Sequence, residues 1–317
     1  MSLYRMGSMG EEVGSIQEEL RRLGLYRGPL DSVFGGGTQS AVRTFQRLKG
    51  ITEDGIVGCE TWKLLFPQQN DIPPPQVCAK TIDHRCLALT GSFETTLPVP
   101  DCFSGLSGDF DGQGVSFGAL QWNFGQGSLQ PMLHEMVEHH TQVLRDIFGD
   151  HFSELHAVLQ AGLEDQLDWV RSLQDHRFRF AEPWHGMFKT LGRQKEFQEI
   201  QLNHAKNIYN TALRWCADYG LQSERAVALM YDIRVQNGSI NDTVKSRILR
   251  DFDRLPRDNE AERLAVIANR RAEAANRRWI EDVRARKLAI AKGEGCVHGR
   301  YYDLETQYGI RLSSFAP

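Results

Sequence analysis

The sequence predicts a mostly α-helical protein of the α+β class, in which a three-helix domain precedes a larger helical domain with a small β element. Three observations predict this fold. Apolar residues recur at helical spacing through most of the 317 residues, a proline-rich stretch follows residue 68, and residues 115–122 are the best strand candidate. We therefore expect a first domain at 1–68, a Pro-rich linker at 69–79 and a second domain at 80–317.

The first domain is predicted from three short amphipathic segments. Apolar positions at helical spacing mark one helix that stops at Gly24 and a second that stops at Gly50, and a third segment surrounds Trp62. Two turn blocks, 31–35 and 54–58, separate these helices, and in each block an aspartate and glycines favour a tight turn. We identify no internal repeat in the sequence.

The second domain is also predicted to be mainly helical. An apolar helical run covers residues 82–94 and ends on Glu94. Residues 129–148 form an amphipathic stripe for which Ser128 is the expected N-cap. Further helices are expected at 155–173, 196–219, 223–231 and 264–283.

Charge and cysteine content narrow the possible functions. The net charge of -4 argues against a nucleic-acid-binding protein, which would present a basic face. No apolar run approaches the roughly 20 residues needed to span a bilayer, so we expect no membrane insertion. Residues 1–7 lack an apolar signal core, so we expect synthesis in a host cytoplasm without a cleaved signal peptide. The six cysteines show no C-x-x-C spacing, so we do not expect paired cysteines to bind a metal. We expect no metal site and no cofactor.

The sequence also bears on disulfide formation and on the oligomeric state. Cys78, Cys86 and Cys102 lie close in sequence, but a reducing site of synthesis disfavours a disulfide among them. We expect the chain to act as a monomer.

Two carboxylates form a candidate acid–base pair. Glu94 closes an apolar helix, where its neighbours and the helix dipole disfavour ionisation, and Asp111 lies in a glycine-rich turn whose amides favour the carboxylate. Sugar hydrolysis requires one carboxyl group that keeps its proton and one that is ionised. The alternative is a helix-end glutamate and a turn-forming aspartate without a catalytic role.

Polar and aromatic residues around Asp111 complete the candidate site. Ser116 is positioned to hydrogen-bond an attacking water, and Asp109 is an alternative to Asp111 as the base. Trp122 could pack on a pyranose ring, although core packing explains it equally well. The expected substrate-binding residues are Asp109, Gln113, Gln121, Trp122 and Asn123.

Three competing motifs are disfavoured by their context. Residues 114–118 fit the G-x-S-x-G nucleophile elbow, but a polar turn precedes them where an apolar strand is needed. The turn that begins at Asp109 fits half of a calcium loop, but Leu120 occupies the position of the bidentate carboxylate. His134 and His139 are one residue too far apart for a zinc-binding H-E-x-x-H helix.

Residues 1–68 resemble the three-helix peptidoglycan-binding domain found on bacterial and phage wall hydrolases. Cys59 stands where that family commonly has proline. The matching segments are 10–13, 16–17, 23–26, 31–35, 41–46, 54–58 and 61–62. This resemblance implies peptidoglycan as the partner of the domain.

Residues 87–129 resemble the catalytic core of the lysozyme-like superfamily, and most closely the pattern of the family 46 chitosanases. Residues 89–94 match the Leu-Thr-x-x-Phe-Glu helix end of that family, and residues 111–116 match its Asp-Gly-Arg-Gly-x-Thr turn. The resemblance implies that Glu94 is the general acid, that Asp111 is the general base, and that Ser116 helps to hold the water. That family inverts the anomeric centre, which requires carboxyls roughly 6.5–9.5 Å apart.

The chain also departs from the chitosanase pattern. Gln113 replaces the arginine, and residues 117–122 are closer to the Gly-Leu-x-Gln strand of lysozymes and lytic transglycosylases. With the wall-binding module, these features predict a phage-endolysin-like peptidoglycan hydrolase that cleaves β-1,4 glycan bonds and acts on the cell wall in the periplasm. The alternatives are a lytic transglycosylase that uses Glu94 alone, a chitosanase with a borrowed anchor, and a non-catalytic wall-binding protein.

Overall fold

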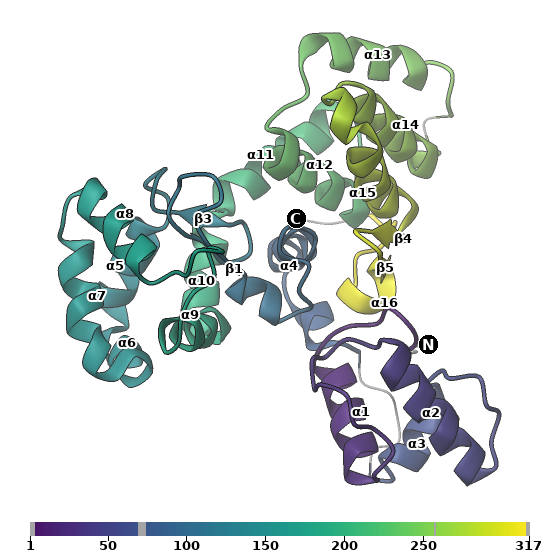
Figure 1. Ribbon diagram of the computed structural model, residues 1–317. Helices are drawn as coiled ribbons and strands as arrows, with labels where there is room; N and C mark the ends of the chain where they lie inside the picture. The colour runs from purple at the N-terminus through teal and green to yellow at the C-terminus, as the bar shows by residue number, and fades with distance from the viewer. Residues whose placement is uncertain (1–3, 69–73, 257, 315–317) are drawn as a thin grey trace. The chain divides into compact units, whose positions relative to one another are not determined.

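The structure is a computed structural model that describes residues 4–68, 74–256 and 258–314. It is mostly helical with two small antiparallel sheets, which confirms the predicted fold class (Figure 1). The chain divides into two compact units. Unit 1 contains residues 1–86 and 208–317, and unit 2 contains residues 87–207. The predicted boundaries at 68 and 80 stay predictions, and residues 69–73 of the predicted linker lie outside the described residues.

The N-terminal part of unit 1 contains the three predicted helices. They are α1 (Glu11–Arg22), α2 (Gly36–Lys49) and α3 (Cys59–Leu65). Their apolar faces meet in one core because the apolar residues recur at the spacing of a helix turn. The fully buried members of this core include Val13, Ile16, Leu20, Phe34 and Val42.

Two buried glutamines reveal an internal repeat that we did not recognise in the sequence. Gln17 and Gln46 are each almost fully buried, and each side-chain amide donates to an aspartate, a backbone carbonyl and a threonine. The acceptors of Gln17 Nε2 are Asp31 Oδ1 at 2.8 Å, the Val33 carbonyl at 3.0 Å and Thr38 Oγ1 at 3.1 Å. The acceptors of Gln46 Nε2 are Asp54 Oδ1 at 2.8 Å, the Ile56 carbonyl at 2.9 Å and Thr61 Oγ1 at 3.1 Å.

The expectation of no internal repeat was therefore wrong. The glutamine and its aspartate are 14 residues apart in the first copy but 8 apart in the second. The aspartate, the carbonyl and the threonine nevertheless recur with a period of 23 residues, at 31, 33 and 38 and again at 54, 56 and 61, so the two turn blocks carry the repeat and only the glutamines depart from its period. Both networks satisfy buried polar groups and fix the two turn blocks against the helices.

We expect Gln17→Leu and Gln46→Leu to destabilise the protein by similar amounts, about 1–3 kcal/mol each. Each change removes the donor from a buried cluster of acceptors and leaves those acceptors unsatisfied. Chemical denaturation monitored by circular dichroism measures the effect. The control is Glu18→Ala, a change at an exposed position of the same helix, which should stay within about 0.5 kcal/mol. If one of the two substitutions left the free energy of unfolding unchanged, the two networks would not be equivalent.

The remainder of unit 1 is a helical region with a β-hairpin before its last helix. Strands β4 (Glu294–Val297) and β5 (Arg300–Asp303) pair antiparallel, with Gly295 opposite Tyr302. This hairpin was not predicted from the sequence. The helices of this region are η1 (Gln76–Ala79), α11 (Lys206–Asp218), α12 (Glu224–Asn237), α13 (Asp242–Phe252), α14 (Glu260–Glu273), η4 (Arg277–Trp279), α15 (Ile280–Lys292) and α16 (Leu304–Tyr308).

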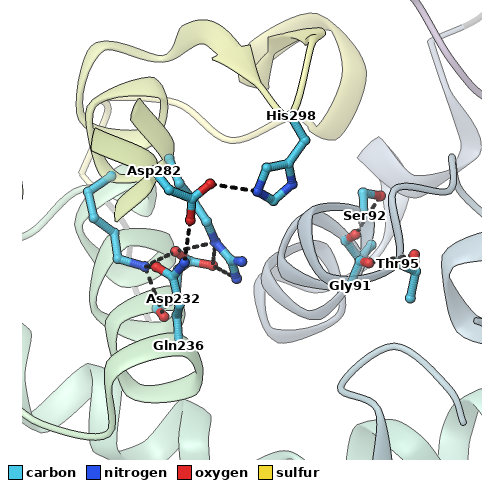
Figure 2. Close-up of polar contacts among 10 residues, drawn as sticks. Gly91, Ser92, Thr95, Asp232, Gln236, Asp282 and His298 are labelled. Atoms are coloured by element: carbon cyan, nitrogen blue, oxygen red, sulfur yellow. Dashed lines mark hydrogen bonds and ion pairs between the residues drawn. The ribbon is translucent and has the colours of Figure 1, made fainter. Parts of the chain in front are cut away.

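A cluster of charged residues is buried in unit 1 between α12 and α15 (Figure 2). Asp232 and Lys287 are 0% exposed and Arg286 is 2% exposed. Arg286 Nη2 donates to Asp232 Oδ1 at 2.7 Å, and Lys287 Nζ donates to Asp232 Oδ2 and, at 2.7 Å, to Gln236 Oε1. The carboxylate of Asp232 therefore joins two cations that are almost completely removed from water.

Unit 2 combines a three-stranded antiparallel sheet with helices (Figure 1). The strands are β1 (Leu106–Ser107), β2 (Ser116–Phe117) and β3 (Trp122–Asn123), in the order β1-β2-β3. The helices are the end of α4 (Ile82–Thr95), η2 (Asp101–Ser104), α5 (Gln130–His139), α6 (Thr141–Phe148), η3 (Gly149–His151), α7 (Phe152–Leu159), α8 (Leu163–Ser172), α9 (Trp184–Arg193) and α10 (Lys195–His204). Phenylalanines from the sheet and the helices, including Phe117, Phe188 and Phe197, form the centre of the core.

Several predicted elements are shorter than expected. Residues 115–122 contain a strand, a turn and the start of another strand, because Gly118 adopts a φ of 82° and reverses the chain. The stripe at 129–148 divides into α5 and α6 at His140. Ser128 does not cap α5, because its hydroxyl accepts from the Asn123 N–H instead.

The later predicted helices also break. The segment 155–173 is interrupted before α8, 196–219 divides into α10 and α11, and 264–283 is interrupted between α14 and α15. Ser223 accepts from the Ala226 N–H and so caps α12 at the predicted start. The periodicity located the helices correctly, but a stripe of apolar residues continues across a break when consecutive helices bury the same side.

Two further observations concern membranes and cysteines. None of the helices in residues 4–68, 74–256 and 258–314 combines the length and the apolar character that crossing a bilayer requires. All six cysteines lie in the described part of the chain, and all six are free thiols.

Candidate active site

Helix α4 presents Glu94 in its last turn, and this end of the helix packs closely on the sheet of unit 2. A Cβ at Gly91 would lie 2.8 Å from the Ala119 Cβ, so the helix backbone approaches the β2–β3 turn directly. The Thr95 hydroxyl donates to the Gly91 carbonyl at 2.7 Å (Figure 2), which satisfies one carbonyl in the last helical turn. Glu94 is half-buried beside these contacts. The helix end is thus fixed while the carboxyl group keeps partial access to solvent.

The pairing of the strands places Ser116 in a polar row. Ser116 lies opposite Ser107 on one side and opposite Asn123 on the other. Residues opposite each other across antiparallel strands point to the same face of the sheet. The neighbouring row contains Phe117 and Trp122, which pack in the core of unit 2, so the row of Ser116 lies on the other face.

Gln121 contacts Gly105, and Gly105 in turn packs on the end of α4. Gln121 adopts a φ of 57°, and its Nε2 donates to the Gly118 carbonyl at 2.9 Å. Its Oε1 accepts from the Ser107 hydroxyl at 2.9 Å. A Cβ at Gly105 would lie 2.2 Å from Thr95 Cγ2 and 3.0 Å from Gln121 Nε2, so Gly105 contacts both side chains. The predicted contact of Gln121 with substrate stays a prediction.

Asp111 lies at the exposed tip of the loop 108–114. Its Oδ1 accepts from the Gln113 N–H at 3.2 Å, as expected for an aspartate that shapes its own turn. The carboxylate is otherwise open to solvent, which a base that activates water requires.

Asp109 has a different environment from Asp111. One oxygen accepts from the Gly114 N–H at 2.7 Å, and the other accepts from Arg171 Nε at 2.7 Å. Burial raises the pKa of Asp109, but the bonds from Arg171 and Gly114 outweigh it and hold the pKa below its ordinary value. The side chain is only 9% exposed. Asp109 is therefore an ionised residue whose two oxygens anchor the loop.

The loop 108–114 is held by two residues that were not predicted from the sequence. Arg171 lies in α8, and Gln174 follows this helix. Gln174 Oε1 accepts from the Asp109 N–H at 2.9 Å, and its Nε2 donates to the Gly114 carbonyl at 3.0 Å. These residues are about 60 positions away in the sequence, and no local pattern links them to the loop. Only folding of α8 onto the sheet brings them together.

The remaining predicted residues lie near the same loop. Gln113 packs on the 123–128 turn, since a Cβ at Gly125 would lie 2.4 Å from its Oε1. Asn123 is 6% exposed, and its Oδ1 accepts from the Gln126 N–H at 2.8 Å. Trp122 is half-buried and packs against the core. Each of these side chains has a structural contact, and the substrate contacts predicted for them stay predictions.

Comparison with known proteins identifies the N-terminal module. Residues 9–65 match the family model described as a peptidoglycan binding domain. The chain is 42% identical over 63 residues to the "Spore cortex-lytic enzyme" of Bacillus cereus, covering 20% of this chain and 24% of that protein. It is 39% identical over 102 residues to "Protein disulfide isomerase pTAC5, chloroplastic" of Arabidopsis thaliana, covering 31% of this chain and 26% of that protein.

The solved structures that resemble this chain include the GH46 chitosanase of Gynuella sunshinyii in complex with chitotetraose, with 14% identity, a TM-score of 0.46, and coverage of 71% of this chain and 98% of the chitosanase. The chain spans about a quarter of the length of the curated relatives it matches. The matches confirm the predicted resemblance: the chain resembles modular peptidoglycan hydrolases and carries a peptidoglycan-binding domain at its N-terminus.

Proposed function

We propose that this protein is a cell-wall-degrading glycoside hydrolase that cleaves β-1,4 bonds in the glycan strands of peptidoglycan. The observation that carries this proposal is the match of residues 9–65 to a peptidoglycan binding domain, in a chain whose unit 2 presents Glu94 and the exposed Asp111. A module that holds the wall raises the effective concentration of the insoluble substrate at an attached catalytic domain.

The mechanism follows from the two carboxylates. Glu94 donates a proton to the glycosidic oxygen, which makes the sugar a better leaving group. Asp111, which is open to solvent, takes a proton from a water that attacks the anomeric carbon. Ser116 lies in the polar row of the sheet and holds that water. The fixed end of α4 keeps the acid oriented, since its last turns are in close contact with Gly105 and Ala119.

Asp109 and Asp111 are expected to respond differently to substitution. Asp111→Asn should reduce the rate of wall hydrolysis by about a hundredfold or more, because the catalytic base is lost. Asp109→Asn should reduce activity by less than tenfold and lower the melting temperature, by about 2–4 °C for each kcal/mol lost, because it weakens the anchor to Arg171. Turbidity assays and differential scanning calorimetry measure both effects. The reverse pattern of activity loss would assign the base to Asp109.

Product analysis tests the proposed reaction. Purified protein is incubated with bacterial sacculi, and the soluble fragments are identified by mass spectrometry. Hydrolysis should give reducing ends with one water added per cleaved bond. Anhydromuramic ends without water would identify a lytic transglycosylase, and digestion of chitosan but not of sacculi would identify a chitosanase with a wall-binding module. If the sacculi stayed intact while the protein remained bound to them, the protein would be a non-catalytic wall-binding protein.

The setting of this activity follows from the substrate. We propose a role like that of a phage endolysin, in which a monomer reaches the wall and anchors through residues 9–65. Size-exclusion chromatography with light scattering checks the monomer.

A further inference from the structure

A cavity of about 550 Å³ opens in unit 2 beside the loop that carries Asp111. Its wall combines β1, the start of the loop, and the segment after α8. The lining residues that matter here are Ser107, Gly108, Phe110, Phe178, Arg179 and His185. We propose that this cavity binds one sugar ring of the glycan strand beside the cleaved bond, an inference that takes its substrate class from the proposed function.

Two phenylalanines present an apolar surface at this cavity. Phe110 is 69% exposed and Phe178 is 42% exposed, and their ring centroids are 5.1 Å apart with the rings inclined at 60°. Exposed apolar groups that gather at one place mark binding sites, whereas single exposed residues need no explanation. The C–H face of a pyranose is an apolar surface that matches an aromatic ring.

The exposure of Phe178 is enforced by the surrounding structure. Phe178 adopts a φ of 58°, which is unusual and strained for a bulky residue. Asp175 holds the turn, because its Oδ1 accepts from the Arg177 N–H at 2.8 Å and from the Arg179 N–H at 3.0 Å. The Arg179 side chain closes the turn with a bond of 2.6 Å to Asp175 Oδ2. This conformation is kept despite its cost, and it displays an aromatic ring at the cavity.

Gly108 brings the two aromatic residues together. A Cβ at this position would lie 2.0 Å from the Phe178 carbonyl oxygen, so the two loops are in backbone contact that a side chain would prevent. The backbone contact between the two loops therefore fixes the two rings next to each other.

The polar groups at the cavity favour a sugar over a charged peptide. Arg179 is already paired with Asp175, and His185 Nδ1 lies 3.0 Å from Glu182 Oε1. A carboxylate of a stem peptide would have to compete with these partners. The Ser107 hydroxyl at the cavity belongs to the same polar row as Ser116. Sugar hydroxyls can bond to such groups without carrying a charge.

The position of the cavity connects it to the proposed reaction. Phe110 immediately precedes Asp111, and Ser107 lies opposite Ser116. A sugar packed on Phe110 would thus neighbour the ring whose bond is cleaved. The aromatic pair would add affinity to substrate and transition state alike, so its loss should raise KM more than it lowers kcat.

The test measures glycan binding without turnover. The full chain carrying Glu94→Gln is titrated calorimetrically with peptide-free peptidoglycan glycan strands, alone and combined with Phe110→Ala or Phe178→Ala. Each alanine should weaken binding by about two- to tenfold. The control is Leu163→Ala, which removes a 45% exposed apolar side chain from α8 in the same unit and should leave affinity unchanged.

Three outcomes would overturn the proposal. They are unchanged glycan affinity in both phenylalanine variants, an equal loss in Leu163→Ala, and a loss of affinity for free stem peptide in place of glycan. Binding through residues 9–65 is the same in all variants, so a difference between their titrations reports a change at the cavity. Because no bond is cleaved in this assay, its result is independent of the product analysis, and either proposal can fail alone.

Discussion

Glu94→Gln is expected to reduce lysis of sacculi at least about a hundredfold while binding to the wall is kept. Glutamine has nearly the shape of glutamate but cannot donate a proton to the glycosidic oxygen. The half-buried position of Glu94 at the fixed end of α4 means that the change should leave the fold intact. Initial rates of turbidity loss and a sacculus sedimentation assay measure lysis and binding on the same sample.

The control for this variant is Glu164→Gln. Glu164 is exposed in the first turn of α8, in the same unit, and its change removes the same charge. Its lysis rate should equal that of the parent. Undiminished lysis by Glu94→Gln would refute the assignment of the acid, and loss of both lysis and wall binding would point to misfolding.

Asp232→Asn is expected to destabilise unit 1 by about 3–5 kcal/mol. The carboxylate is completely buried, and its removal leaves Arg286 and Lys287 as two buried cations without their shared counter-charge. Chemical denaturation of the full chain measures the loss. The control is Glu281→Ala, which breaks an ion pair with Arg284 at a residue 82% exposed and should cost about 0–1 kcal/mol. Equal small effects of the two variants would contradict a structural role for the buried cluster.

The environment of Asp232 also predicts how the stability of the fold depends on pH. Burial raises the pKa of Asp232, but Arg286 and Lys287 outweigh it and lower the pKa to about 2. The unfolded chain binds the proton near pH 4, so the carboxylate stabilises the fold above that pH, and this contribution is lost as the pH falls from about 4 toward 2. Asp232→Asn should lack this component of the acid-induced loss of stability.

The candidate site was only partly predictable from the sequence. The helix that ends near Glu94 was predicted because its apolar residues lie within one local run, and α4 covers residues 82–95. The turn of Asp111 was predicted from its glycines and aspartates, whose hydrogen bonds are local. The roles of Arg171 and Gln174 were not predictable, because each contacts the loop from a distant position in the chain. For the same reason the sequence could not separate the anchoring Asp109 from the exposed Asp111.

By itself the sequence determined the fold class, the N-terminal peptidoglycan-binding domain and the local elements that carry Glu94 and Asp111. These features depend on short-range periodicity, turn residues and a family pattern that neighbouring residues carry. Only the tertiary structure decided that each buried glutamine joins its turn block, that Gly105 contacts both Thr95 of α4 and Gln121, and that Phe110 meets Phe178. Such contacts join residues at unrelated sequence distances, and the packing of the whole unit selects them.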